Sequence, residues 1–569
     1  MRVWQYQVDI ESFVSVMASG VSVFAFLPWH QAYVNHSNRL LLSGNEAVAL
    51  AALHAGVHLG TGYPGTPSTE ILERLSELGG RAQWAPNEKV ALEVALGVAF
   101  GGGAALVTMK HVGLNVAADP LFSATHTGVS APLIIVSADD PGMASSQNEQ
   151  DNRRYAVAAG VPMLEPSDSQ EAYAFTLAAV ELSGRWRMPF LLRLTTRVCH
   201  SKTVVVPGTA SPPKHPGFVR DIQSHVMIPA YARSAHRRLR KNLAELGRWN
   251  ETSRFNHILD GKRDLGIISS GVAAVHVREA APQTHLLKLG MTYPLPLEKI
   301  RRFATGVKRC VVVEEGDPFL VEQLRTAGIA VEDKPKQYRF GELNVGRVRR
   351  LLAGDTSPEP PPPKGNPPAL CAGCPHRKTF EVLRKLDCIV AGDIGCYSLG
   401  VLPPLEAMDT LVCMGASIGM GLGYRHVLPR EEARRVVSVI GDSTFVHSGI
   451  TGLVEMVYNP PATGHVVLIL DNGTTAMTGL QEHPGTGRTL DHQPTGKVDF
   501  EALARSLGIR HVHVFDPLRD PEGFEEALRG SLGREELAVF IVRRPCLLAA
   551  SKIKEYDRAA ARRCMEEEE

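Results

Sequence analysis

VVSVIGDS (436–443) and HVVLILDN (465–472) are two short apolar runs, each of which ends in acidic or polar side chains. Uninterrupted runs of this kind, rich in Val, Ile and Leu, are typical of strands that are buried on both faces of a parallel sheet. Ligands of open α/β sheets bind outside the carboxyl ends of such strands. The two runs therefore predict an α/β domain in which Asp442 and Asn472 lie at the binding edge.

Similar apolar runs along the rest of the chain predict further strands, with helix-length segments between them. The runs cover 104–110, 132–138, 189–194, 265–271, 285–291, 308–315, 511–515 and 537–544. Alternation of strands and helices is typical of a mostly parallel sheet covered by helices on its faces. We therefore expect an α/β protein with two doubly wound parallel-sheet domains and a smaller α/β domain.

Changes in composition along the chain suggest its domain boundaries. We expect an N-terminal extension (1–39), a first domain (40–206), a connecting segment (207–262), a middle domain (263–355), a Pro-rich linker (356–368), a last domain (369–550) and a frayed tail without a core-forming pattern (551–569). The proline run of the linker favours an extended polyproline conformation. HRRLRK (236–241) is interpreted as a solvated helix face, and a phosphate-binding patch is the alternative.

The composition argues against several classes of protein. The 569 residues include 61 basic and 60 acidic side chains, so there is no net basicity for nucleic acid and no acidic excess for disorder. Nine cysteines are too few for a disulfide scaffold and favour a reducing, cytoplasmic compartment. The apolar run at 13–29 is short and broken by serines, so we expect a buried or loosely packed extension rather than a membrane span or a signal peptide.

The triplet GDS (441–443) follows the first strand, and the pair DN (471–472) follows the second. Together they resemble the thiamine diphosphate signature, in which a GDG-type turn is followed downstream by NN or DN. A diphosphate needs a divalent cation, and Mg²⁺ takes oxygen ligands. The resemblance assigns these ligands to Asp442, Asn472 and the backbone carbonyl of Thr474, with Gly441 and Ser443 beside the phosphates. Ser443 replaces the usual third glycine. Two ordinary β–turn segments are the alternative interpretation.

Further motifs resemble the 2-oxoacid:ferredoxin oxidoreductases, and in particular the alpha subunits of indolepyruvate ferredoxin oxidoreductases. The resemblance spans about residues 40–548 and is carried by GYPGTPSTEI (62–71), TMKHVGLNVAADPL (108–121), CAGCPHR (371–377), GDIGCYSLG (392–400) and CMGASIGMG (413–421). It implies a pyrimidine-side first domain, a transketolase-C-like middle domain and a diphosphate-binding last domain. Together these would form a thiamine diphosphate-binding fold.

The aminopyrimidine ring of such a cofactor needs a glutamate partner from the pyrimidine-side domain. Glu88 and Glu93, both in NEKVALEVALGVAFGG (87–102), are candidates that the residues alone do not separate. The family pattern assigns the catalytic role to Glu88. By the same resemblance, Thr66 is the loop threonine near cofactor and substrate, and Gly415 is a cofactor-binding residue.

Four cysteines match the family's ligand pattern for one [4Fe–4S] cluster: Cys371, Cys374, Cys396 and Cys546. A zinc site at the CxxC motif, or small buried residues at the other two positions, are the alternatives. The ferredoxin-like module that usually ends these alpha subunits is missing from the sequence. The module through which electrons would leave the enzyme is therefore absent, lost by truncation or supplied by another polypeptide.

The resemblance implies thiamine diphosphate-dependent oxidative decarboxylation of an arylpyruvate, of the indolepyruvate type, to the aryl-acetyl-CoA, with a ferredoxin-type electron acceptor. The expected partners are a smaller beta subunit, ferredoxin or a separate electron-transfer polypeptide, coenzyme A, and a second alpha chain in a homodimer within a hetero-oligomer; nucleic acid and membrane are not expected. A non-oxidative decarboxylase would use the same Asp442, Asn472 and Glu88 without a cluster. A non-catalytic subunit is the third possibility.

Overall fold

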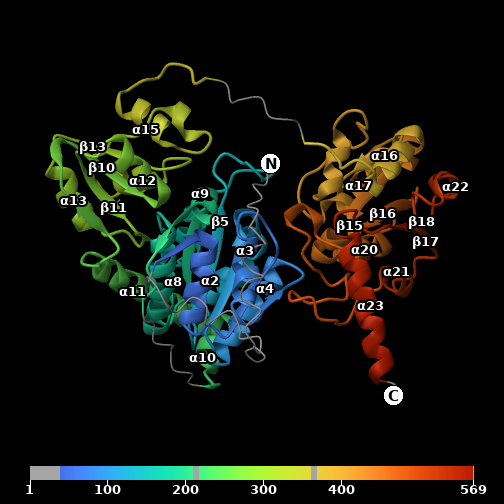
Figure 1. Ribbon diagram of the computed structural model, residues 1–569, viewed down its shortest axis with the longest axis horizontal. Coiled ribbons are helices and arrows are strands. Elements are labelled where there is room, and N and C mark those ends of the chain that lie inside the picture. The colour runs from blue at the N-terminus through green and yellow to red at the C-terminus, as the bar shows by residue number, and fades with distance from the viewer. Residues whose placement is uncertain (1–38, 209–216, 361–367, 568–569) are drawn as a thin grey trace, which may run out of the picture.

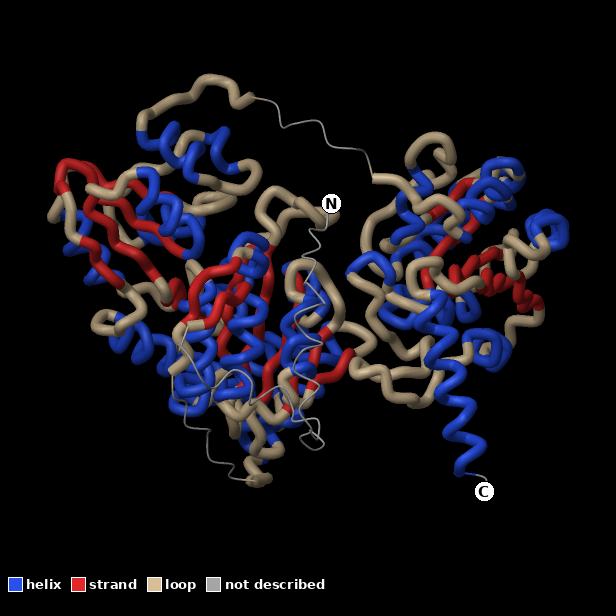
Figure 2. Tube along the Cα trace, in the orientation of Figure 1, coloured by secondary structure: helices blue, strands red, loops and turns tan. Residues whose placement is uncertain are grey.

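The computed structural model describes residues 39–208, 217–360 and 368–567, and it forms two lobes in Figure 1. The apolar run predicted to be a buried or loosely packed extension (13–29) lies outside the described residues. Sheets lie at the centre of both lobes, with helices around them (Figure 2). Within the described ranges, no helix is both long enough and apolar enough to cross a membrane.

The first domain is built on a seven-stranded sheet. In spatial order its strands are β12 (Met291–Tyr293), β6 (Met163–Leu164), β7 (Phe190–Thr195), β5 (Leu133–Asp139), β4 (Ala105–Lys110), β2 (Leu59–Gly62) and β3 (Ala82–Trp84). All neighbours are parallel except β12, which runs antiparallel to β6. β12 lies within the range expected for the middle domain, so the two domains share one sheet edge.

Helices cover both faces of this sheet. They are α2 (Gly44–His54), α3 (Thr69–Glu77), α4 (Glu88–Phe100), α5 (His111–Val116), α6 (Ala118–Thr127), α7 (Asn152–Ala159), α8 (Ser169–Trp186) and α9 (Thr196–His200). Side chains of one strand alternate between two cores: Ile134 packs with α2, α3 and α8, whereas Ile135 packs with α4 and α6. A separate antiparallel pair joins β1 (Leu40–Ser43) to β8 (Lys202–Val205).

The connecting segment contains α10 (Ile222–His225) and α11 (Pro229–Asn250). HRRLRK (236–241) lies in α11, where Leu239 is buried against the first domain and His236, Arg237 and Arg240 are exposed. This distribution is that of an amphipathic helix with a solvated basic face.

The middle domain has a four-stranded sheet in the order β13 (Arg309–Val313), β10 (Lys262–Ser270), β11 (Thr284–Leu289) and β9 (His257–Leu259), with β9 antiparallel. Its helices are α12 (Gly271–Ala280), α13 (Leu297–Thr305), α14 (Phe319–Thr326) and α15 (Val345–Leu352), with a short 3₁₀ turn η2 (Lys336–Arg339). It is smaller than its neighbours, as predicted.

The last domain has a five-stranded, wholly parallel sheet in the order β14 (Ile389–Ala391), β15 (Val436–Gly441), β16 (His465–Asp471), β18 (Leu537–Arg543) and β17 (His511–Phe515). Its helices and turns are α16 (Pro375–Lys385), η3 (Cys396–Val401), α17 (Ala416–Val427), α18 (Arg430–Arg434), α19 (Asp442–Thr444), η4 (Phe445–Gly449), α20 (Ile450–Tyr458), η5 (Ala476–Thr478), α21 (Phe500–Ser506) and α22 (Pro521–Arg534). Apolar cores lie on both faces. The structure therefore confirms the two doubly wound domains and the smaller α/β domain.

The expectation of a frayed tail is wrong, because the chain continues as a helix, α23 (Ala550–Glu567), seen projecting from the last domain in Figure 1. The segment is rich in Ala, Lys, Arg and Glu, which are strong helix formers. Its first turns also have tertiary contacts: the ring of Tyr556 stacks on His492 with 5.0 Å between centroids. Propensity and packing together account for the helix.

Candidate cofactor site

Asp442 and Asn472 directly follow the neighbouring strands β15 and β16, and the sheet brings them together. Oδ2 of Asp442 accepts the backbone N–H groups of Asn472 (3.1 Å) and Gly473 (2.8 Å), while Oδ1 accepts that of Ser443 (2.8 Å). Asp442 is 2% and Asn472 8% exposed. The two loops therefore form one buried polar edge, as the sequence predicted.

Two histidines that the sequence analysis did not select border this edge. Nε2 of His483 lies 3.3 Å from Oδ2 of Asp442, and Nε2 of His376 lies 3.3 Å from the amide nitrogen of Asn472. Burial alone would raise the pKa of Asp442, but His483 and the backbone donors hold it below its usual value. Burial lowers the pKa of His376 to about 4. His376 lies in the CAGCPHR motif without an assigned role and His483 lies in no quoted motif, so only the fold shows that both border this edge.

The donor set at this edge fits Mg²⁺. Asp442 offers a carboxylate, and the amide oxygen of Asn472, which also accepts the N–H of Thr474 (3.0 Å), lies on the adjacent loop. Mg²⁺ prefers such oxygen ligands and commonly shares them with substrate phosphates. Over the described ranges, no group of three or more His, Cys, Asp or Glu side chains is arranged to hold a metal ion. A cation here would therefore depend on amide, carbonyl and phosphate oxygens besides the one carboxylate.

Glu88 and Glu93, the two candidates that the sequence alone did not separate, have different surroundings. Glu88 is the first residue of α4, which the side chain of Asn87 caps by accepting the N–H of Val90 (2.9 Å). Glu88 is 4% exposed and its Oε2 lies 2.9 Å from Nε2 of His447. Glu93 lies on the outer face of the helix and pairs with Lys89. Glu88 alone of this pair faces the last domain.

Hydrogen bonds between side chains of the first and last domains enclose the site. The hydroxyl groups of Tyr63 and Ser443 are 2.8 Å apart. Farther out, the amide of Gln481 donates to Glu73 of α3 (2.8 Å). The pyrimidine-side and diphosphate-side residues therefore meet within a single chain.

The other two predicted residues lie on loops that border the site. Thr66 is half-buried in the loop between β2 and α3. Gly415 precedes α17 with a φ of 84°, and its N–H donates to the buried Asp393 (2.9 Å). A Cβ at this position would lie 2.4 Å from the Cβ of Ser448, so a residue without a side chain is required.

Lys110, at the carboxyl end of β4, is a residue that the sequence analysis missed. Its side chain runs beside Gly65, at which a Cβ would lie 3.2 Å from the lysine Cδ, and its Nζ donates to the carbonyl of Ser145 (3.0 Å). Burial lowers the pKa of Lys110, although the carboxylates of Asp140 and Glu88 oppose that shift. A cation therefore lies near both the Thr66 loop and Glu88.

The four predicted cluster cysteines lie on loops that meet beside Asn472. The N–H of Cys546 donates to the carbonyl of Asn472 (2.9 Å), and Leu547 would be 3.4 Å from a Cβ at Gly373, inside the CxxC motif. Burial raises the pKa of the Cys396 thiol to about 11, and the thiols of the other three cysteines add to the shift. Thiols on neighbouring loops suit an iron–sulfur group in donor chemistry, but among the described residues these side chains are not arranged as a metal site.

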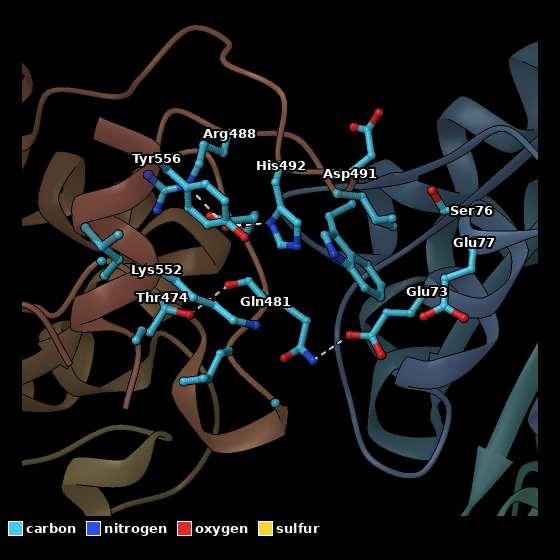
Figure 3. A pocket seen from close by; sticks show the side chains of 18 residues that line it. Glu73, Ser76, Glu77, Thr474, Gln481, Arg488, Asp491, His492, Lys552 and Tyr556 are labelled. Atoms are coloured by element: carbon cyan, nitrogen blue, oxygen red, sulfur yellow. Dashed lines mark hydrogen bonds and ion pairs between the residues drawn. The ribbon is translucent and has the colours of Figure 1, made fainter. Parts of the chain in front are cut away.

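A cavity of about 390 Å³ lies next to this edge, between α3, the loop that follows β16, and α23 (Figure 3). Gly473 is among the residues that line it, as are Thr474, Glu73, Arg488 and Tyr556, which are labelled in Figure 3. Burial raises the pKa of Glu73. The sequence analysis did not identify the part of the wall that α23 supplies, because it expected no structure in the tail.

Comparison with known proteins agrees with this architecture. Residues 393–542 match the family model described as thiamine pyrophosphate enzyme, C-terminal TPP binding domain. Residues 50–214 match the model for the thiamine diphosphate-binding part of pyruvate flavodoxin/ferredoxin oxidoreductases. The first and last domains therefore each match a family model for a thiamine diphosphate-binding domain.

Curated relatives match over nearly the whole chain. Indolepyruvate oxidoreductase subunit IorA of Archaeoglobus fulgidus is 39% identical over 556 residues, which cover 91% of this chain and 88% of the relative. The IorA subunit of Methanothermobacter marburgensis is 40% identical over 552 residues, with the same coverage. That of Thermococcus kodakarensis is 37% identical and covers 90% of this chain and 86% of the relative. By this identity and coverage, the chain belongs to the indolepyruvate oxidoreductase IorA-subunit family.

Proposed function

We propose that the chain is the catalytic alpha subunit of a thiamine diphosphate-dependent oxidoreductase that decarboxylates an arylpyruvate and delivers the aryl-acetyl group to coenzyme A. The observation that carries the proposal is the buried contact of Glu88 with His447, which follows Asp442 by five residues in the domain where Asp442 and Asn472 form one polar edge. The names of the curated relatives support a 2-oxoacid, and specifically an indolepyruvate-type, substrate.

The cofactor, when bound, supplies an electron sink that makes loss of CO₂ from a 2-oxoacid possible. Asp442, Asn472 and the carbonyl of Thr474 would hold Mg²⁺, which neutralises the diphosphate. Gly441 and Ser443 lie on the same turn, where the backbone can approach the phosphates. Gly415 would contribute backbone to the cofactor site at the start of α17, where its lack of a side chain lets Ser448 pack closely.

On the pyrimidine side, Glu88 holds and releases a proton at its carboxylate, as general acid–base catalysis requires. Its burial excludes water from that exchange. Thr66, in the loop that follows β2, and Lys110, at the end of β4, lie close together, because the Lys110 side chain packs against Gly65. We assign the carboxylate of the 2-oxoacid to the Lys110 ammonium, since a buried anion needs a cationic partner.

Electrons from the oxidation need an acceptor. Cys371, Cys374, Cys396 and Cys546 would hold one [4Fe–4S] cluster beside the Asn472 loop. Ferredoxin or a separate electron-transfer polypeptide would be the external acceptor. A smaller beta subunit and a second alpha chain complete the assembly that we propose, in the reducing cytoplasm that the sparse cysteines favour.

The decisive experiment uses anaerobic protein co-expressed with a beta subunit and supplied with thiamine diphosphate, Mg²⁺, coenzyme A and indolepyruvate. We expect reduction of a viologen dye that depends on coenzyme A, together with formation of the aryl-acetyl-CoA. The Asp442→Ala variant is the inactive control. Release of CO₂ with an aldehyde product, and without dye reduction, would instead identify a non-oxidative decarboxylase.

A further inference from the structure

His447 lies in an unusual backbone element. It is the third residue of η4 (Phe445–Gly449), a π-helical turn between α19 and α20 that follows the Asp442 loop directly. Single π-turns inside α-helices are rare and concentrate at functional sites. The turn carries an imidazole that is 4% exposed and faces the first domain. The position of His447 favours a role beyond packing.

The imidazole uses both nitrogens. Nε2 lies 2.9 Å from Oε2 of Glu88, and Nδ1 lies 2.6 Å from the hydroxyl of Ser448. An ionised carboxylate can only accept, so Nε2 carries the hydrogen and Nδ1 accepts the Ser448 O–H when the ring is neutral. The edge of the Tyr63 ring meets the imidazole with centroids 4.7 Å apart. Ring orientation and tautomer are therefore both determined by neighbours.

A second hydrogen bond joins the same two segments. The side-chain amide of Asn87 donates to the backbone carbonyl of His447 (2.9 Å), while its oxygen caps α4. Asn87 of the first domain therefore binds the main chain of His447, and Glu88 binds its side chain. The position of the Glu88 carboxylate relative to the Asp442 edge depends on these bonds.

Gly113 borders the opposite side of the carboxylate. A Cβ at this position would lie 2.6 Å from Oε1 of Glu88 and 2.7 Å from its Cγ. The glycine therefore leaves room for the carboxylate, while His447 engages its other oxygen. Oε1 occupies the space left by the missing side chain of Gly113, and Oε2 is hydrogen-bonded to His447.

We propose that His447 is the positioning residue of Glu88: from the diphosphate-side domain it orients the carboxylate that serves the pyrimidine ring. The inference rests on the proposed function, because Glu88 is assigned its role there. His447 makes no contribution to holding Mg²⁺ or the diphosphate, which depend on Asp442 and Asn472. Loss of the imidazole should therefore impair proton transfer and leave cofactor binding intact.

The test compares His447→Leu with His447→Gln in the full chain loaded with thiamine diphosphate and Mg²⁺. Leucine fills similar space without a donor, whereas the glutamine amide replaces the Nε2 donor. We expect about 100-fold slower exchange of the cofactor C2 proton in His447→Leu, the scale of a lost acid–base contribution, and recovery to within about tenfold in His447→Gln. The affinity for thiamine diphosphate, measured by calorimetry, should stay within about threefold of wild type in both.

A double variant separates positioning from a general structural role. If His447 acts only through Glu88, then Glu88→Gln with His447→Leu should exchange the C2 proton no more slowly than Glu88→Gln alone. Equal exchange rates in His447→Leu and wild type, or multiplied losses in the double variant, would overturn the inference. Failure of the proposed function has another signature: wild-type protein that binds no thiamine diphosphate, or a Glu88→Gln variant with unchanged exchange.

Discussion

The Glu88 carboxylate and the His447 imidazole lie 2.9 Å apart although 359 positions separate them in the chain. One belongs to the first turn of α4 and the other to η4, in a different domain. The chemistry of the site consequently depends on how two domains dock, and several variants can test its parts separately.

Asp442→Ala should abolish retention of thiamine diphosphate and Mg²⁺. Asp442 is the single carboxylate that we assign to the metal, and its loss leaves the diphosphate charge without compensation. Cofactor and magnesium contents after desalting measure the effect. Asp260→Ala, an exposed carboxylate in the middle domain, is the matched control. Wild-type cofactor content in Asp442→Ala would refute the metal assignment.

Glu88→Gln should retain the cofactor but slow exchange of its C2 proton by about 100-fold or more, because the amide keeps the size of the side chain and cannot transfer the proton. Glu93→Gln, on the exposed face of the same helix, should exchange like wild type. Proton NMR of quenched samples gives both rates. A larger loss in Glu93→Gln would show that the wrong glutamate had been chosen.

Cys374→Ser should lower the iron content without releasing thiamine diphosphate, since the two sites use different side chains. Wild-type protein prepared anaerobically should contain about four iron atoms per chain. Cys413→Ser, an exposed cysteine outside the proposed set, should leave iron unchanged. Wild-type protein free of iron, despite full support for cluster assembly, would favour the non-oxidative decarboxylase.

Lys110→Met should raise KM for the 2-oxoacid by about tenfold or more, the scale of one hydrogen bond to a charged group. The affinity for thiamine diphosphate should be unchanged. Lys89→Met, which removes an exposed lysine from α4, is the control. Steady-state kinetics over a range of 2-oxoacid concentrations gives KM and kcat separately. An unchanged KM would contradict the assignment of Lys110 to the substrate site.

Acid should destabilise the buried ion-pair cluster around Arg153, which lies where the first and middle domains meet. Arg153 is buried between Asp151 (2.7 Å) and Glu314 (2.5 Å). Burial would raise the pKa of Asp151, but Arg153 lowers it to about 2. A carboxyl group with a lowered pKa stabilises the fold above its unfolded pKa and loses that contribution as pH falls. The urea midpoint should therefore drop between about pH 4 and pH 2, and Asp151→Asn should reduce this drop.

The sequence predicted those parts of the molecule that local pattern determines. Apolar runs such as 436–443 and 465–472 became buried parallel strands, and Asp442 and Asn472 followed them to one edge, because strand direction alone brings those ends together. His447, His483 and Lys110 could not be predicted in this way. Their neighbours come from other domains or distant strands, and no local pattern distinguishes them from ordinary polar residues.

The strand β12 (Met291–Tyr293) has a consequence for how the chain reaches its native state. It covers the edge of β6 in the first sheet, and Thr292 donates to the buried Glu165 (2.7 Å). A fragment that ended at residue 206 would leave that edge open to pairing with other chains. It would also remove one donor from the Glu165 carboxylate, which would keep its ion pair with Arg193. The first sheet is therefore complete only after residues 291–293 have been synthesised, so its native edge depends on a segment beyond the first domain.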